Sequence, residues 1–243
     1  MEHIKSEVEK LSLSGKKYAI VQLCVRSTKN RNTSDWRELW QNAAIVWSYY
    51  DLFELCKEDG VPHNFNFYYS PLGVDEVFKR TKLNKKKNYV IASNGQGYLT
   101  ESVRECILAA TEVNKKVFHL GPKVTNKPGV EFSNEMPDSD LAKKYSECEF
   151  VSGLRRTEGF ELPVIEAFAC GARPIVFDMP HYRAWFNDFA IFIPEEGREK
   201  VIQSLVEIFK KGAKTVTKKE IDEVIKRFDW DKIVKGFWKK CLK

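Results

Sequence analysis

The sequence predicts an α/β protein that is built on a doubly wound, mostly parallel sheet and preceded by a reduced α/β part. From Tyr18 onward, short runs of β-branched and aromatic residues alternate with stretches of helical apolar spacing, which is the pattern of βα units. The chain has 243 residues, of which 43% are apolar and 30% charged, as is typical of a folded chain. Its 13 glycines and 9 prolines are too few for a collagen-like or low-complexity chain.

Strands are expected where β-branched and aromatic residues gather in short runs. These runs are residues 18–25, 43–47, 66–70, 89–93, 116–120, 149–152, 173–177 and 190–193. Helices are expected in the stretches between and after the strands, where apolar residues recur every three or four positions. These stretches are residues 35–41, 50–59, 100–113, 139–146, 162–170, 199–211, 218–228 and 231–242.

The best candidate for a domain boundary is the segment 71–75, where a proline and a glycine end a strand before a polar, lysine-rich stretch. Residues 1–75 hold only two or three expected strands, which is too few for a complete doubly wound sheet. Residues 76–228 hold five βα units, and residues 229–243 form a C-terminal helix. The complete sheet is therefore expected in the second part.

The charge of the chain is mildly basic, since 40 basic and 34 acidic residues give a net charge of +6. The lysines gather in runs at 79–87, 210–219 and 235–243, and such runs are typical of solvated helix faces. Peripheral contact with an anionic membrane, or with an acidic partner, stays open. A nucleic-acid partner is not expected, because no recognition motif and no interleaving of aromatic with basic residues accompanies the charge.

The apolar runs and the cysteines bear on the cellular compartment in which the protein is expected. No run approaches eighteen apolar residues, and the first residues include acids and lack an apolar core. We therefore expect neither a membrane-spanning helix nor a secretory signal. The six cysteines lie far apart and form no C-x-x-C pair, which favours reduced thiols and a cytoplasmic protein.

The most informative segment is 151–174, which reads as a strand, a loop, a helix, a turn and a second strand. In an open α/β sheet, ligands bind outside the carboxyl ends of the strands, where this loop and this helix start are expected. Pro163 suits the first helical turn because its missing N–H costs nothing there. Gly171 suits the end of the helix.

The start of this helix is predicted to bind a diphosphate. The backbone amides of Phe160, Glu161 and Leu162 precede or begin the helix, so they are expected to lack partners within it. Unpaired N–H groups and the helix dipole both favour an anion. Glu158 and Glu166 flank this position, eight residues apart, and each carboxylate could accept hydrogen bonds from paired hydroxyls on one side of the diphosphate.

Taken together, these residues form the motif E-G-F-x-L-P-x-x-E-A-x-A-C-G-x-x-P, which resembles the donor-binding E-x7-E motif of the retaining glycosyltransferases of the GT-B fold, most of all family 4. The resemblance covers residues from about 43 to the C-terminus. Further segments also resemble the family. They are 71–75 with Phe78, the strand 117–121, the strand 130–132 and the helix 140–145 on the nucleobase side, and 228–230 at the start of the last helix.

The resemblance implies a Rossmann-like donor domain at 76–228, a reduced acceptor-side part at 1–75 and a last helix that packs back toward that part. It also implies roles for single residues. Glu158 would meet the transferred sugar as the catalytic residue, and Glu166 would meet the ribose hydroxyls. The amides of 160–162 would hold the diphosphate, and Met136 would lie nearest the base.

The resemblance further implies a retaining, metal-independent hexosyltransferase without a cofactor. Its donor would be a nucleoside-diphosphate sugar, and its acceptor a hydroxyl of an unknown glycan, lipid or protein. Protein amides and basic side chains, rather than a metal ion, would offset the charge of the leaving diphosphate.

The sequence departs from the family at the phosphate site. The family carries an arginine and a lysine after the first strand of this domain, whereas residues 93–100 contain neither. Gly95 and Gly97 would let the backbone approach a phosphate. Arg155 and Arg156 would supply the missing charge, or else form a solvated pair. Glu161 stands where the family has a glycine; it either points away from the diphosphate, contacts the sugar or complements the helix dipole.

The largest departure is the short part before Gly73, which is well below the length of an acceptor domain in the family. We expect either a small acceptor or completion of the site by a second copy or a partner subunit. The alternative is a non-catalytic GT-B-like binding or scaffolding subunit. The missing cations favour this alternative, and the intact pair of Glu158 and Glu166 favours the enzyme.

Overall fold

The computed structural model describes residues 7–8, 10–11, 14, 16–23, 33–81, 89–93, 101–156 and 160–242. The chain divides into two compact units. The first comprises residues 1–72, 157–160 and 230–243, and the second comprises 73–156 and 161–229.

The second unit is built on a six-stranded sheet in which every pairing is parallel, with the strand order β6-β5-β4-β7-β8-β9. Such a sheet is buried on both faces, and the strand β7 is buried at all four positions. The strands are β4 (Tyr89–Ser93), β5 (Lys116–Leu120), β6 (Val130–Ser133), β7 (Phe150–Gly153), β8 (Arg173–Phe177) and β9 (Ile191–Ile193).

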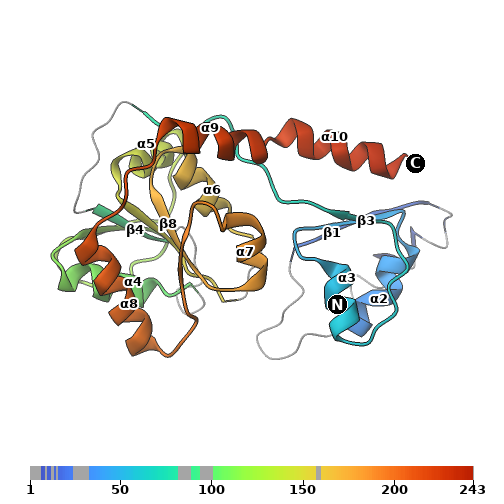
Figure 1. Ribbon diagram of the computed structural model, residues 1–243, viewed down its shortest axis with the longest axis horizontal. Coiled ribbons are helices and arrows are strands. Elements are labelled where there is room, and N and C mark those ends of the chain that lie inside the picture. Colours follow the sequence, from blue (N-terminus) through green and yellow to red (C-terminus); the bar gives the residue numbers. More distant parts are fainter. Residues whose placement is uncertain are drawn as a thin grey trace. The chain divides into compact units, whose positions relative to one another are not determined.

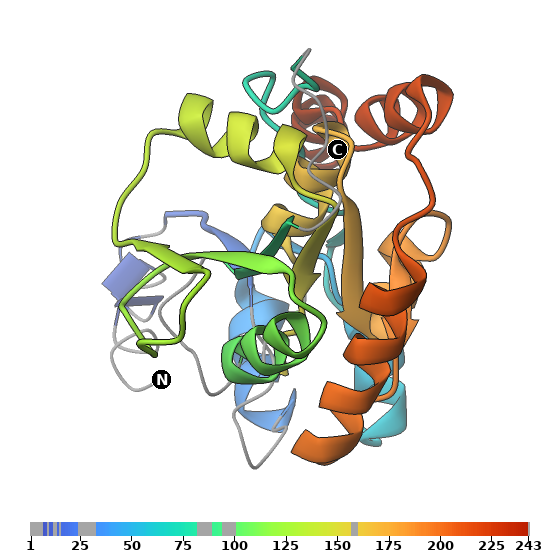
Figure 2. The same cartoon turned by 90° about the vertical axis from the view of Figure 1, so that its left-hand side faces the viewer.

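Helices cover both faces of this sheet. In Figure 2, α4 and α8 pack together below the sheet and α5 lies above it. The helix α6 packs against α5 and α9. The helices of this unit are α4 (Val103–Glu112), α5 (Asp138–Glu147), α6 (Leu162–Ala169), α7 (Pro180–Phe186), α8 (Arg198–Lys211) and α9 (Lys218–Arg227).

The strand order places a switch point between β4 and β7. From β4 the chain adds β5 and then β6 on one side, and from β7 it adds β8 and then β9 on the other. Doubly wound sheets bind ligands at the carboxyl edge beside such a point. The residues that directly follow β7 therefore hold the expected position for a site, and the predicted fold class is confirmed.

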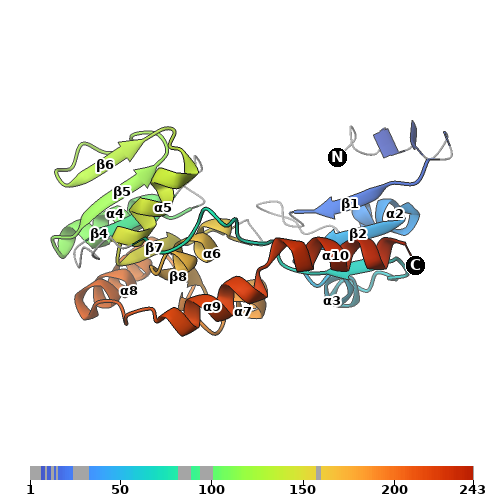
Figure 3. The ribbon, with the colours of Figure 1, turned by 90° about the horizontal axis from the view of Figure 1, so that it is seen from above.

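The first unit holds a three-stranded parallel sheet of order β1-β2-β3. In Figure 1 and Figure 3, the helix α10 lies along one face of this sheet, while α2 and α3 lie on the other. The elements are β1 (Ala19–Gln22), β2 (Ile45–Ser48), β3 (Phe67–Tyr69), α2 (Thr33–Asn42), α3 (Leu52–Glu58) and α10 (Trp230–Cys241).

Aromatic contacts and one close approach hold α10 on this sheet. The ring of Trp47 on β2 lies 5.4 Å from Phe237 and 6.3 Å from Trp230, measured between centroids. The hydroxyl of Tyr68 on β3 donates a hydrogen bond of 2.8 Å to the Ile233 carbonyl. A Cβ atom at Gly236 would collide with that hydroxyl, so only glycine lets the helix approach this closely.

Five of the six cysteines lie in the part of the chain that the structure describes, and none of those five forms a disulfide. Four of them, Cys56, Cys106, Cys148 and Cys170, are buried. Over the same residues, no helix combines the length and the apolar character needed to cross a bilayer.

Candidate functional site

The candidate site begins at the amino end of α6. Glu161 is the N-cap residue, with φ −111° and ψ 97°, and its side chain makes no capping hydrogen bond. Pro163 lies in the first turn and has no N–H to donate. Among the described residues, none accepts a hydrogen bond from the Leu162 amide. The helix therefore presents an available donor and the positive end of its dipole at the carboxyl edge of the sheet.

The side chain of Glu161 is turned into the protein, where it is 2% exposed. Its carboxylate lies 3.1 Å from Nε of Arg155 and 3.4 Å from the hydroxyl of Tyr182. Nη2 of Arg155 also lies 3.3 Å from the carboxylate of Glu101, which is 8% exposed. One guanidinium is thus paired with two buried acids, so its charge is largely compensated inside the protein.

Arg156 is directed to the starts of two other helices. It donates a hydrogen bond of 2.5 Å to Oγ of Ser102, just before α4, and its Nε lies 3.4 Å from Glu195, just before α8. The guanidinium also lies over the ring of Phe177, 4.8 Å from its centroid. Unlike Arg155, it pairs with an acid that is 38% exposed. Solvent screens such a pair, so the charge of Arg156 is less compensated than that of Arg155 and can attract an anion more strongly.

Glu166 lies on α6, between the loop that precedes α5 and the segment that begins the second unit. Its side chain is partly buried, and burial is the main reason why its pKa is raised from 4.5 to about 8. The negative charges of Asp138 and Asp75 raise this pKa further. Tyr145 of α5 is also near, because the charge of Glu166 contributes to the raised pKa of that phenol. An acid held in such surroundings destabilises the fold when ionised, which is typical of functional positions.

Met136 lies in the short connection between β6 and α5, two residues before Asp138, and its side chain is partly exposed. The connection is held by a hydrogen bond of 2.6 Å from Oγ of Ser133 to the Glu135 carbonyl. Because the charge of Asp138 raises the pKa of Glu166, this connection lies on the Glu166 side of α6. Met136 therefore lies two residues from an acid whose charge acts on Glu166.

Three of the predicted site residues, Glu158, Gly95 and Gly97, lie outside the residues that the structure describes. Phe160 is described and buried, and it groups with the first unit. The predicted residues that lie in the second unit are Glu161, Leu162, Glu166, Met136, Arg155 and Arg156, and among them Arg155 pairs with Glu161.

Sequence reasoning did not identify Glu101, Ser102, Tyr182 or Asp138 as parts of this site. Each meets a predicted residue only through the fold, and Ser102 is 54 positions from Arg156. One signal was available, because Glu101 and Ser102 directly follow the stretch in which the family's two cations are missing. Within the described residues, no group of three or more His, Cys, Asp or Glu side chains is placed to hold a metal ion.

Gly153 permits the close packing of β7 against α6, and replacing it with alanine tests this contact. The added Cβ would collide with Cγ2 of Val164 and would lie 3.2 Å from Cγ1 of Val176. We expect a loss of about 1–3 kcal/mol in the free energy of unfolding, measured by urea denaturation. Gly197→Ala is the control, since nothing lies within 4 Å of a Cβ there. Equal stability of the two variants would contradict the packing described.

The parallel sheets with helices on both faces, and the switch point beside α6, define the fold of the GT-B glycosyltransferases. Sucrose-phosphate synthase from Thermosynechococcus elongatus superimposes with a TM-score of 0.71 at 15% identity, over 95% of this chain and 69% of that one. The pneumococcal O-GlcNAc transferase GtfA, solved with UDP and GlcNAc, gives 0.73 at 14% identity, over 96% and 53%. Anabaena HepE, solved with UDP, gives 0.71 at 12% identity, over 96% and 74%.

These likenesses concern the fold. The chain spans about half the length of GtfA and about two thirds of the synthase. No family model matches the sequence, and comparison with curated proteins gives no match. The resemblance in fold that the motif around Glu166 implied is thus confirmed by structures of very low sequence identity.

Proposed function

We propose that this protein is a retaining, metal-independent glycosyltransferase that moves a sugar from a nucleoside-diphosphate sugar to a hydroxyl acceptor. The observation that carries the proposal is Glu166, an acid with a raised pKa on the helix whose amino end offers the Leu162 amide. The fold supports it, since the similar structures include sugar transferases. Those solved with UDP make UDP-sugars the first donors to test.

Each part of the donor has a candidate partner. The ribose hydroxyls donate to the carboxylate of Glu166, because an ionised carboxylate accepts several hydrogen bonds. The diphosphate accepts from the amides at the start of α6 and from Arg156, and the base lies beside Met136. Glu158 and the backbone at Gly95 and Gly97 complete the proposed site, with Glu158 next to the transferred sugar.

Arg155 takes a different role in this proposal. Its ion pairs with Glu101 and Glu161 link the chain just after β7 to the start of α6 and compensate the charge of Glu161. Arg155 is thus a positioning residue, and Arg156 is the nearby cation that meets the diphosphate. This division compensates for the two cations that residues 93–100 lack.

In the proposed reaction, the bond between the sugar C1 and the diphosphate oxygen breaks, and a bond from the acceptor oxygen to C1 forms on the same face. The amides of α6 and Arg156 stabilise the negative charge that develops on the leaving diphosphate. The proton of the acceptor hydroxyl passes to a phosphate oxygen of that leaving group. Glu158 orients the sugar while the positive charge builds up at C1.

The proposal extends to location and partners. It places the protein in the cytoplasm, with a glycan, lipid or protein as acceptor. One similar structure is a GtfA/B complex, which supports a search for a partner subunit or a second copy. On α10, Val234 is 38% and Trp238 54% exposed among lysines, which supports peripheral contact with an anionic membrane; flotation with anionic vesicles tests this contact.

A panel of UDP-, GDP- and ADP-sugars tests the function. We expect one donor to raise the melting temperature by about 5 °C or more at a hundredfold excess over its dissociation constant. Glu158→Ala should then lower donor hydrolysis or transfer about 100-fold while leaving this shift in place. Binding without any turnover in the wild type would favour the scaffolding subunit, and no shift with any donor would contradict both the enzyme and the donor site.

A further inference from the structure

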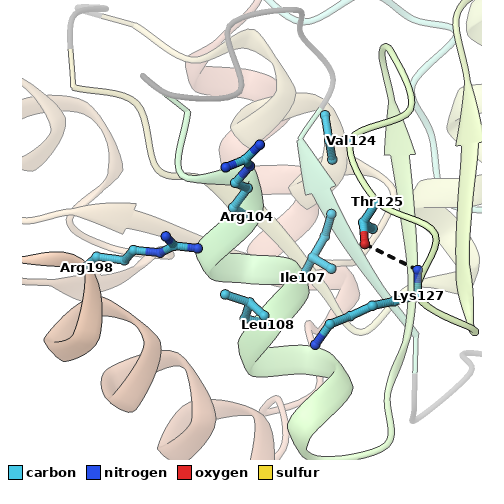
Figure 4. A pocket seen from close by; sticks show the side chains of 7 residues that line it. All are labelled: Arg104, Ile107, Leu108, Val124, Thr125, Lys127 and Arg198. Carbon is cyan, nitrogen blue, oxygen red and sulfur yellow. Dashed lines mark hydrogen bonds between the residues drawn. The ribbon is translucent and has the colours of Figure 1, made fainter.

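A pocket lies on the opposite face of the second unit's sheet from α5. It is formed between α4, the connection from β5 to β6 and the first residue of α8, and its volume is about 200 Å³ (Figure 4). The residues that line it are Arg104, Ile107, Leu108, Val124, Thr125, Lys127 and Arg198. None of them belongs to the proposed donor site.

The lining combines three cationic side chains with an apolar floor. Arg104, Lys127 and Arg198 come from three different elements and stand around the pocket, while Ile107 is buried beneath them (Figure 4). The hydroxyl oxygen of Thr125 accepts a hydrogen bond of 3.2 Å from the Lys127 amide, which leaves its own proton for a ligand. None of the seven lining residues is acidic.

The charge of Arg198 is only weakly compensated by its ion pair with Glu105. Nε of Arg198 lies 3.9 Å from the carboxylate of Glu105, beyond hydrogen-bond distance. The N-cap residue of α8, Gly197, has no side chain to cap the first amides of the helix, and the acid of its first turn, Glu199, is not among the residues that line the pocket. Like charges gathered from separate elements repel one another unless an anion lies between them.

We propose that this pocket binds the phosphate group of a small phosphate monoester, separately from the sugar donor. Two guanidinium groups suit phosphate, because each can donate two parallel hydrogen bonds to its oxygens. The apolar floor of Ile107, Leu108 and Val124 contacts the carbon part of the ester. Ligand sites for larger molecules occupy about 300–1,000 Å³, so this smaller pocket excludes a whole nucleotide sugar.

Titration with glycerol 3-phosphate, followed through the methyl NMR signals of Ile107, Leu108 and Val124, tests the pocket. At constant ionic strength we expect saturable shifts, and tighter binding of the ester than of inorganic phosphate, since only the ester reaches the apolar floor. Glycerol alone should cause no shifts. Arg104→Gln and Arg198→Gln should each weaken ester binding about tenfold or more, because each removes hydrogen bonds between charged groups.

Lys219→Gln on α9 is the matched control, since it removes the same charge from a side chain that is 86% exposed, and it should leave ester binding unchanged. Equal weakening in Lys219→Gln, or unsaturable shifts, would overturn the site. Equal affinity for inorganic phosphate and the ester would overturn the assignment to an ester. Glu166→Gln should also leave ester binding unchanged, so the outcome is separate from that of the proposed function.

Discussion

Arg155→Met is expected to lower the free energy of unfolding by about 3–5 kcal/mol. The guanidinium of Arg155 lies between the carboxylates of Glu101 and Glu161, which are 8% and 2% exposed. Methionine fills a similar volume but removes the cation that the two buried acids share. An uncompensated buried charge is costly because water no longer solvates it.

Urea denaturation measures this loss, and Lys218→Met is the control. The Lys218 pair with Asp222 is 86% and 57% exposed, so its removal should cost less than about 1 kcal/mol. Adding Glu161→Gln to Arg155→Met should recover part of the stability, since it removes one of the two stranded charges. A loss no larger than that of the control, or no recovery in the double variant, would contradict the role assigned to Arg155.

Glu166→Gln is expected to weaken binding of the UDP-sugar donor about 10- to 100-fold. This is the usual effect on a dissociation constant when a hydrogen bond to a charged group is lost. In the free protein the pKa of Glu166 is about 8, so the side chain is mostly protonated at pH 7. The ribose hydroxyls donate to the ionised form, so donor binding releases a proton. Wild-type affinity should therefore rise between pH 6 and pH 8, by up to tenfold per pH unit, whereas the Gln variant should show no such rise.

The same substitution should raise stability at alkaline pH. The pKa of Glu166 is about 8 in the folded protein against an ordinary value of 4.5, so the folded state holds the proton more tightly than the unfolded state. The contribution of this group to stability is fully present below pH 4.5 and is lost as the pH rises to about 8. Glutamine resembles the protonated acid, so the variant should match the wild type below pH 4.5 and exceed it increasingly as the pH rises to about 8.

Calorimetric titration at several pH values measures the donor affinity, and urea denaturation at the same pH values measures the free energy of unfolding. Glu207→Gln, an exposed acid on α8, is the matched control and should change neither affinity nor stability. A purely structural role of Glu166 would change stability alone. Unchanged donor affinity in Glu166→Gln, at every pH, would remove Glu166 from the donor site.

The sequence predicted the second unit well because its local signals agree with its packing. The strands β4, β5 and β8 begin and end where the β-branched runs do. Pro163 in the first turn and Gly171, with φ +86°, fix the ends of α6 as predicted. The strand β6 has no fully buried residue, so its apolar pattern was weak, and only the family resemblance placed it.

The polar organisation of the site could not be predicted in the same way. Arg155 and Glu101 are far apart in sequence, and no spacing rule links Glu161 to Tyr182. The raised pKa of Glu166 likewise depends on burial and on acids from two other segments.

Diffraction from crystals of the protein grown with UDP tests the donor site most directly. We predict that the ribose hydroxyls lie about 3 Å from the carboxylate of Glu166 and that a phosphate oxygen accepts from the Leu162 amide at a similar distance. UDP bound elsewhere in the second unit, or bound at the sheet edge with its ribose away from Glu166, would contradict the donor site.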